Sequence, residues 1–166
     1  MAKLKYIIIT IIGLVILQGC GAYSFSGINT TANTFQVSFF QNQAPITIPG
    51  IDQLFTNRLQ DLILNQTNLD LVTSNADVIY EGEIVQYNTQ PQTATSANNA
   101  AQNRLNIAVN VRFYDTQNPE EDLEQRFSFF FDFDASQSEV NIRDTALDVI
   151  YERITQDILN ATLAKW

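Results

Sequence analysis

Apolar and polar residues largely alternate in three stretches of this chain, residues 34–40, 104–114 and 123–134, with Gln125 and Phe130 as exceptions in the last. Strict alternation of apolar and polar side chains is typical of β-strands that bury one face. We therefore predict three strands, each with one face turned to a core. The side chains expected on that face are Phe35, Val37 and Phe39 in the first strand, Leu105, Ile107, Val109, Val111 and Phe113 in the second, and Phe127, Phe129, Phe131 and Phe133 in the third.

Two further segments of strand-like composition lie between the first two of these strands. Residues 69–72 predict a short or edge strand, and residues 77–87 predict a longer one. Gly82 falls inside the longer segment, where a glycine marks a bulge or a close approach of another group. Residues 88–102 lack apolar periodicity, and a polar loop of this length in a compact domain is usually functional or disordered.

Two segments carry apolar residues at helical spacing, residues 50–66 and a stretch from Ser136 to about residue 163. Pro49 stands where the start of a helix tolerates proline. The second segment opens with a Ser-x-x-Glu pattern, Ser136 to Glu139, which has the form of a capping box. The predicted apolar stripes are Ile51, Leu54, Phe55, Leu59, Leu62 and Ile63 on the first helix, and Leu147, Ile150, Tyr151, Ile154, Ile158 and Leu159 on the second.

These elements predict an α+β fold. The simplest arrangement is a two-layer sandwich with two helices packed on one face of a small, three- to four-stranded, mostly antiparallel sheet. Residues 34–166 would form this single domain, because the chain is long enough for one core and too short for two ordinary domains.

The N-terminal residues have the pattern of an export signal. Lys3 and Lys5 precede an apolar run that is about as long as a signal-peptide core and too short for a comfortable membrane span. The run ends in Leu17-Gln18-Gly19-Cys20, which resembles a bacterial lipobox. That resemblance implies cleavage after residue 19 and attachment of acyl chains to Cys20. Residues 1–19 are then a lipoprotein signal peptide, and residues 20–33 a lipid-anchored tether with one short strand.

The alternative is that Cys20 is a buried or free thiol that follows an uncleaved anchor helix. A disulfide within the chain is excluded, because Cys20 is the only cysteine. A zinc site is not expected either, because the chain has no histidine.

Charge limits the classes of partner. The chain has 9 basic and 18 acidic residues and a net charge of −9. Removal of the signal segment would take away Lys3 and Lys5 and make the balance more acidic still. Nucleic acid is therefore not expected as a partner, because phosphate backbones require a basic face.

The sequence offers no positive case for an enzyme. Histidine, the commonest general base, is absent, and no Gly-x-Ser-x-Gly or phosphate-loop motif occurs. Glu81 with Glu83, and Asp132 with Asp134, are carboxylate pairs that would suit glycosidase or metal chemistry. The simpler interpretation is a solvated strand face. We expect no catalytic residues, no metal and no cofactor.

Basic residues are few, which makes their positions informative. Arg104 and Arg112 fall on the polar face of one predicted strand, roughly 26 Å apart at a strand rise of about 3.3 Å per residue. A guanidinium at Arg104, beside the long polar loop, suits bidentate binding of a phosphate. The alternative is that it pairs with one of the many acidic neighbours.

Several segments in order resemble a known family. They are the lipobox leading into GCGAYSFSG, the helix after Pro49-Gly50, NLDLV before ADVIYEGEIVQY, then NRLNIAVNVRFYD, RFSFFFDFDAS and the closing ILNATLAKW. Together they resemble the LptE family of lipopolysaccharide (LPS) assembly lipoproteins in the form found in Bacteroidota. The resemblance covers nearly the whole mature chain.

This resemblance implies a location and partners. Members are anchored in the inner leaflet of the outer membrane, bind the β-barrel protein LptD, sit as a plug within its lumen and assist delivery of LPS to the cell surface. It also implies basic contacts to LPS, for which Arg104 and Arg112 are the candidates here. The alternative function is a non-catalytic, periplasm-facing lipoprotein of another envelope or secretion complex, since a fold alone does not determine a function.

Overall fold

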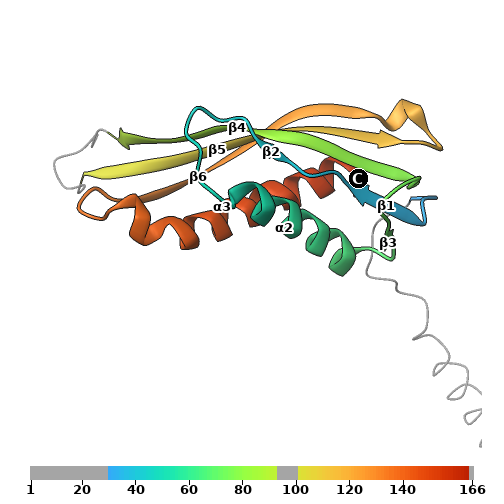
Figure 1. The fold of residues 1–166 in the computed structure, drawn as a ribbon, viewed down its shortest axis with the longest axis horizontal. Helices are drawn as coiled ribbons and strands as arrows, with labels where there is room; N and C mark the ends of the chain where they lie inside the picture. Colours follow the sequence, from blue (N-terminus) through green and yellow to red (C-terminus); the bar gives the residue numbers. More distant parts are fainter. Residues whose placement is uncertain (1–29, 93–100, 165–166) are drawn as a thin grey trace, which may run out of the picture.

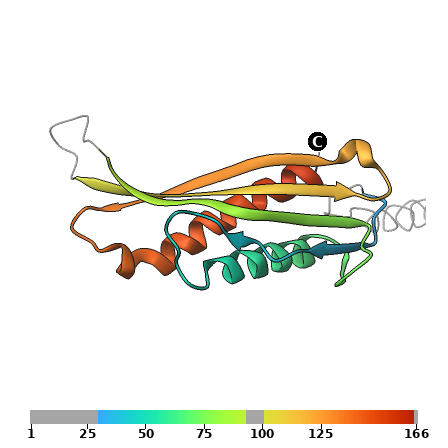
Figure 2. The same cartoon turned by 45° about the horizontal axis from the view of Figure 1, so that its top comes forward.

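The computed structural model describes residues 30–92 and 101–164. Helices α2 (Ile51–Gln66) and α3 (Glu139–Thr162) lie on the same side of one sheet, and the opposite side of the sheet is uncovered (Figure 1, Figure 2). The predicted α+β sandwich with both helices on one face is therefore confirmed. The predicted signal peptide and Cys20 lie outside the described residues.

The sheet is larger than predicted and mixed. It has six strands in the order β3-β1-β4-β5-β6, with β2 paired to β4. The strands β4, β5 and β6 are antiparallel, whereas β1 runs parallel to both β3 and β4. The strands are β1 Thr34–Val37, β2 Gln41–Asn42, β3 Asp70–Leu71, β4 Val78–Gln92, β5 Gln102–Asp115 and β6 Leu123–Asp134, with a short 3-10 helix at Pro119–Glu121.

The prediction of three to four mostly antiparallel strands was wrong for two physical reasons. Strand β2 is two residues long, which is too short to show any alternation, whereas β3 lies within the short strand that was predicted at residues 69–72. Helix α2 follows β1 in the chain and crosses over before β4, and such a crossover leaves the two strands parallel.

The first predicted strand ends earlier than its alternation suggests. Strand β1 stops at Val37, and Phe39, predicted to face the core, is 49% exposed. Phe40 is buried instead, with its backbone N–H donating to Oγ1 of Thr56 on α2 at 3.1 Å. Its ring meets that of Phe55 edge-on at 5.1 Å between centroids. Packing against the helix therefore overrides the local alternation.

The central hairpin is longer than predicted. Strand β4 continues to Gln92 and β5 begins at Gln102, so residues 88–92 belong to a strand and not to the predicted loop of residues 88–102. Thr89 explains part of this extension, because its hydroxyl donates to the Glu139 carboxylate at 2.7 Å and ties the strand to α3. Residues 93–100 lie outside the described residues.

The predicted capping box of Ser136 and Glu139 does not form, because Glu139 bonds to strand β4 instead. Helix α3 starts at Glu139, not at Ser136, and Ser138 precedes it without a side-chain capping bond. The Glu139 carboxylate accepts hydrogen bonds from Tyr87 at 2.8 Å and from Thr89, while the backbone N–H of Ser136 donates to Asp134. The start of α3 is thus fixed by bonds to β4, which the local sequence does not reveal.

The core fills the space between the two layers. All six residues of the predicted α3 stripe are buried, and so are the five alternating residues predicted for β5. On α2 the stripe is confirmed except for Leu54, which is exposed, and Leu62, which is partly buried. Two tyrosine hydroxyls in the core are satisfied: Tyr80 bonds Thr162 at 2.9 Å, and Tyr151 donates to the carbonyl of Ile51 at 3.1 Å.

Residues 30–33 connect the domain to the segment that precedes it. The short strand predicted within residues 20–33 is absent from residues 30–33, and residues 20–29 lie outside the described part. Within residues 30–92 and 101–164, no helix combines the length and the apolar character needed to cross a membrane.

A close contact requires glycine at position 82. Of the two interpretations offered by the sequence, a bulge or a close approach, the close approach is therefore confirmed. A Cβ atom at this position would lie 2.5 Å from the Phe40 ring and would also meet the carbonyl oxygen of Asn110. The irregularity in the β4–β5 register is elsewhere, between Ile84 and Gln86. The glycine therefore allows Phe40 to lie against β4.

We expect Gly82→Ala to lower the free energy of unfolding by about 1–3 kcal/mol, the usual cost of overpacking. The added methyl group must push aside either a ring in the core or the backbone of β5. Chemical denaturation would measure the change, with Glu81→Ala on the same strand as the control, expected to stay within about 0.5 kcal/mol of the wild type. Equal stability of Gly82→Ala and wild type would contradict the contact.

Candidate functional site

The uncovered face of the sheet is formed by the solvent-side residues of β4, β5 and β6. Cross-strand pairing aligns these side chains in rows, such as Glu81, Arg112 and Glu124 at one end and Gln90, Arg104 and Asp132 at the other. Amides and charged groups dominate the face, and its large exposed aromatic side chains are Phe130, 39% exposed, and Tyr114, 38% exposed. The residues concerned are Glu81, Glu83, Gln86, Asn88, Gln90, Arg104, Asn106, Ala108, Asn110, Arg112, Tyr114, Glu124, Arg126, Ser128, Phe130 and Asp132.

Arg104 lies on this face, as predicted, and is bound on two sides. Its Nε and Nη2 atoms donate to the two carboxylate oxygens of Asp132 at 2.6 and 2.8 Å. Its guanidinium carbon lies 3.7 Å from the centre of the Phe130 ring, within the range of a cation–π contact. The hydrogen bonds from Arg104 lower the pKa of Asp132 below its usual value, so this carboxyl group is held ionised.

Arg112 occupies the opposite end of the face and is also paired. Its Nη1 and Nη2 atoms donate to the Glu83 carboxylate at 3.2 and 2.9 Å, and Asn110 adds a third bond at 3.3 Å. The bond from Arg112 is the main cause of the lowered pKa of Glu83. The structure thus brings the two predicted arginines onto one face and gives each of them an acidic partner.

A third arginine of the face was not singled out from the sequence. Arg126 of β6 donates to the amide oxygen of Gln86 on β4, so its side chain reaches across the intervening strand. Ala108 lies between them on β5 and is fully buried although it is on the solvent side. Only the register of the three strands places these residues together.

The carboxylate pairs considered for catalysis lie on or beside the uncovered face. Glu83 and Asp132 are engaged by Arg112 and Arg104. A carboxylate held ionised by an arginine is poorly suited to act as a general acid, which needs a raised pKa. Among the described residues, no three Asp, Glu, His or Cys side chains gather in a way that could hold a metal ion.

Asp77 forms a clamp where the tether enters the domain. Its carboxylate accepts bonds from the backbone N–H of Asn33 at 2.8 Å and of Thr34 at 3.0 Å, from the Thr34 hydroxyl at 3.0 Å, and from the Gln117 amide at 2.9 Å. The bonds from Asn33, Gln117 and Thr34, in that order, lower its pKa from 3.8 to about 2. Asp77 therefore joins the entering segment, the start of β4 and the β5–β6 turn.

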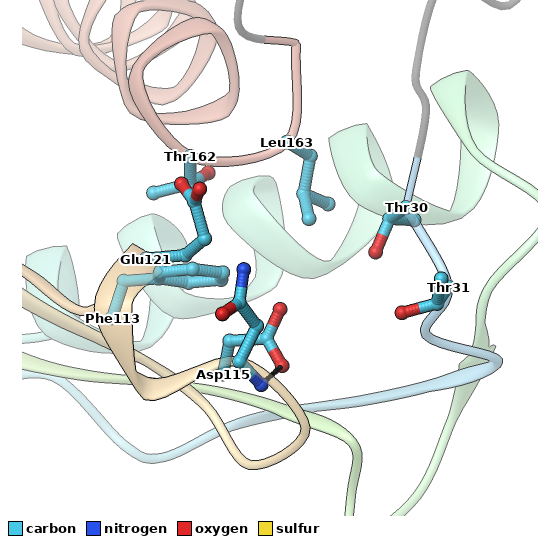
Figure 3. A pocket seen from close by; sticks show the side chains of 8 residues that line it. Thr30, Thr31, Phe113, Asp115, Glu121, Thr162 and Leu163 are labelled. Carbon is cyan, nitrogen blue, oxygen red and sulfur yellow. Dashed lines mark hydrogen bonds between the residues drawn. The ribbon is translucent and has the colours of Figure 1, made fainter.

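A pocket of about 250 Å³ opens at the same end of the molecule (Figure 3). Thr30 and Thr31 of the entering segment line one side, and Thr162 and Leu163 at the end of α3 line another. Asp115 lies at the end of β5, where its carboxylate accepts bonds from the β5–β6 turn. The pocket is thus a junction between the tether, the end of α3 and this turn.

Comparison with known families identifies the chain. The sequence model described as "LptE: Lipopolysaccharide-assembly" matches residues 32–162, which span the sandwich from just before β1 to the end of α3. The chain belongs to the LptE family. No curated protein sequence matches it.

Solved structures show that the fold of this LptE-family protein is shared with other bacterial proteins. A protein from Xanthomonas campestris matches with a TM-score of 0.55 at 8% identity, covering 82% of this chain and 86% of that chain. A hypothetical protein from Chlamydia trachomatis matches with a TM-score of 0.51 at 11% identity, covering 76% and 93%. A subunit of the PelC dodecamer from Paraburkholderia phytofirmans matches with a TM-score of 0.50 at 9% identity, covering 84% and 93%. At these identities the likeness concerns the fold alone.

Membership of the LptE family supports the general role that the sequence predicts. The chain is an LPS-assembly protein of a lipoprotein family that is not enzymatic. The Asp77 clamp, the bridge between Arg126 and Gln86 and the role of Glu139 were missed, because their partners are 40 or more residues away in sequence.

The lowered pKa of Asp77 predicts how stability depends on pH. A carboxyl group whose pKa falls on folding stabilises the folded state above its unfolded pKa, and this contribution is lost as the pH falls through the folded pKa. We expect Asp77→Asn to be less stable than the wild type at pH 7, and the difference to shrink between about pH 4 and pH 2. Denaturation of both proteins across this pH range is the measurement. A difference that does not change with pH would show that the charge of Asp77 is not the cause.

Proposed function

We propose that this LptE-family protein is an outer-membrane lipoprotein that binds an LptD-type β-barrel, occupies part of its lumen and assists LPS assembly at the cell surface. The observation that carries the proposal is the family match over residues 32–162, which includes every element of the sandwich. The protein faces the periplasm and is held to the membrane by acyl chains on Cys20.

The uncovered face suits such a position. The interior wall of a large barrel is polar and lined with water. A face of amides and partnered arginines can lie against it without burying an unpaired guanidinium, which would be costly. Each of the three arginines on this face has a partner, Asp132, Glu83 or Gln86. Direct contacts to the barrel would then be hydrogen bonds exchanged between polar side chains.

The Asp77 clamp suits an anchored protein. Asn33 is thirteen positions after Cys20, and a chain of that length reaches at most roughly 45 Å when fully extended. The domain is therefore confined close to the membrane surface. Several acyl chains, each CH₂ contributing about 0.8 kcal/mol, make the attachment effectively permanent. Asp77 would transmit that attachment to β4, the central strand of the sheet.

The partner can be tested by purifying the tagged, lipidated protein from gently solubilised outer membranes and identifying what accompanies it. We expect a near-stoichiometric large β-barrel of the LPS-transport type. Cys20→Ser, which cannot receive the acyl chains, is the control and should be lost from the membrane fraction. Recovery of a different envelope or secretion complex would support the alternative function and overturn this proposal.

We further propose that Arg104 and Arg112 contact the phosphate groups of LPS. A phosphate would have to compete with the carboxylate that each arginine already binds. Asp132→Asn should therefore strengthen LPS binding by releasing Arg104, and Arg104→Gln should weaken it. A change of about five-fold in each direction corresponds to about 1 kcal/mol.

Binding of fluorescent LPS to the purified protein would measure these changes. Arg58→Gln is the matched control, because Arg58 pairs with Asp148 in the helix layer and lies away from the uncovered face. If the Asp132→Asn and Arg104→Gln proteins both bind LPS as tightly as the wild type does, Arg104 does not contact LPS. Arg112 is tested in the same way with Glu83→Gln and Arg112→Gln.

A further inference from the structure

Strand β6 forms one edge of the sheet. It is 12 residues long and pairs with β5 only, so its other side has no neighbour among the described strands (Figure 1). Most of its residues are exposed or only partly buried. A strand in this position offers its backbone to any chain that can lie beside it.

The hydrogen-bond pattern shows which residues face the open edge. The backbone N–H of Ala135 donates to the carbonyl of Ala101 at 3.0 Å, which sets the phase of the antiparallel β5–β6 ladder. In such a ladder alternate residues bond the partner strand and the others point away. The residues whose N–H and C=O groups point away from β5 are Glu124, Arg126, Ser128, Phe130, Asp132 and Asp134. The carbonyl of Asp134 already accepts the N–H of Gln137 at 2.9 Å, so the open part of the edge ends at this residue.

This edge lacks several of the usual features that prevent pairing. Strand β6, LEQRFSFFFDFD, contains no proline and no lysine. Its register with β5 runs without a shift from Gln102 opposite Asp134 to Phe113 opposite Leu123, so no bulge bends it. Proline, lysine and bulges are common protections of edge strands, and a regular edge rich in phenylalanine is prone to add a strand. Charged side chains also protect an edge, and those of β6 are of both signs, so they oppose pairing only where like charges meet.

The order of side chains on the edge is complementary to itself. When a second copy of β6 is placed antiparallel with Phe130 opposite Phe130, Arg126 of each copy faces Asp134 of the other. Arg126 would exchange its bond to Gln86 for this pair, and the Asp134 carboxylate would keep the N–H of Ser136 on one oxygen. Ser128 then faces Asp132, whose carboxylate can accept a hydrogen bond from the serine hydroxyl. On the helix side, Phe127 faces Phe133 and Phe129 faces Phe131, which are favourable cross-strand pairs.

Other registers are less favourable. Only pairs of even-numbered residues exchange backbone bonds across this edge, so the alternative registers differ by slides of two residues. A slide of one copy that shifts the centre from Phe130 to Phe129 places Glu124 opposite Asp134. A slide in the other direction leaves Arg126 without a facing carboxylate. The alignment centred on Phe130 is therefore the one that pairs both arginines and sets no like charges opposite each other.

We propose that two copies of this protein associate through antiparallel pairing of their β6 strands, centred on Phe130, to form one continuous sheet. The occupant of the edge is a second copy because the opposite charges lie at the two ends of the same strand. This pairing concerns the protein by itself and is independent of its barrel partner.

Charge reversal gives a specific test with the mature, lipidated protein in detergent. Arg126→Asp and Asp134→Arg each set like charges opposite each other and should weaken self-association at least ten-fold. A mixture of the two variants restores both pairs, because the carboxylate introduced at position 126 of one chain then faces the guanidinium introduced at position 134 of the other. We expect the mixture to associate within a few-fold of wild-type strength, as measured by sedimentation velocity and by co-purification of two different tags.

Gln86→Ala is the matched control, because it removes the hydrogen bond of Arg126 without changing any charge on the edge. It should associate as the wild type does, and circular dichroism would show that every variant keeps its fold. A wild-type protein that stays monomeric at every concentration, or a mixture that associates no better than the single variants, would overturn the proposal. Cross-links from the β6 edge that reach only a different protein, and never a second copy of this chain, would also overturn the proposal.

Discussion

The ring of Phe55 lies between the rings of Phe40 and Tyr151, and the rest of the sandwich depends on this contact. Both neighbours meet Phe55 edge-on at 5.1 Å between ring centroids. Phe55 belongs to α2, Tyr151 to α3 and Phe40 to the segment between β1 and β2. One buried ring thus joins the two helices to the parallel side of the sheet, and Gly82 leaves the room that Phe40 needs.

The two faces of the sheet are stabilised by different interactions. On the helix side, apolar side chains are removed from water, which is the main favourable contribution to folding. On the other side, charges and amides stay in water and pair with one another across the strands. This division explains how a chain with a net charge of −9 keeps a sheet face with three arginines: each guanidinium binds a carboxylate or an amide oxygen there.

The sequence by itself determined the two helices, the long antiparallel strands and their buried faces, because periodicities of two and of 3.6 residues report directly on which side chains meet the core. It also placed Arg104 and Arg112 on one polar face, since residues an even number apart on a strand share a side. The family was recognisable from the order of the segments. Local pattern could not show the two-residue strand β2, because alternation needs more residues than it contains, although the composition of residues 69–72 did predict the short strand β3.

Only the tertiary structure determined which side chains contact one another. Phe39 and Phe40 exchange roles because α2 packs against one of them, and Glu139 bonds to β4 instead of capping its own helix. The pairing of Arg104 with Asp132, of Arg112 with Glu83 and of Asp77 with Asn33 joins residues 28 to 44 positions apart. Such contacts depend on strand register and on helix crossover, which arise from packing the whole chain around one core and leave no signal in any short stretch of sequence.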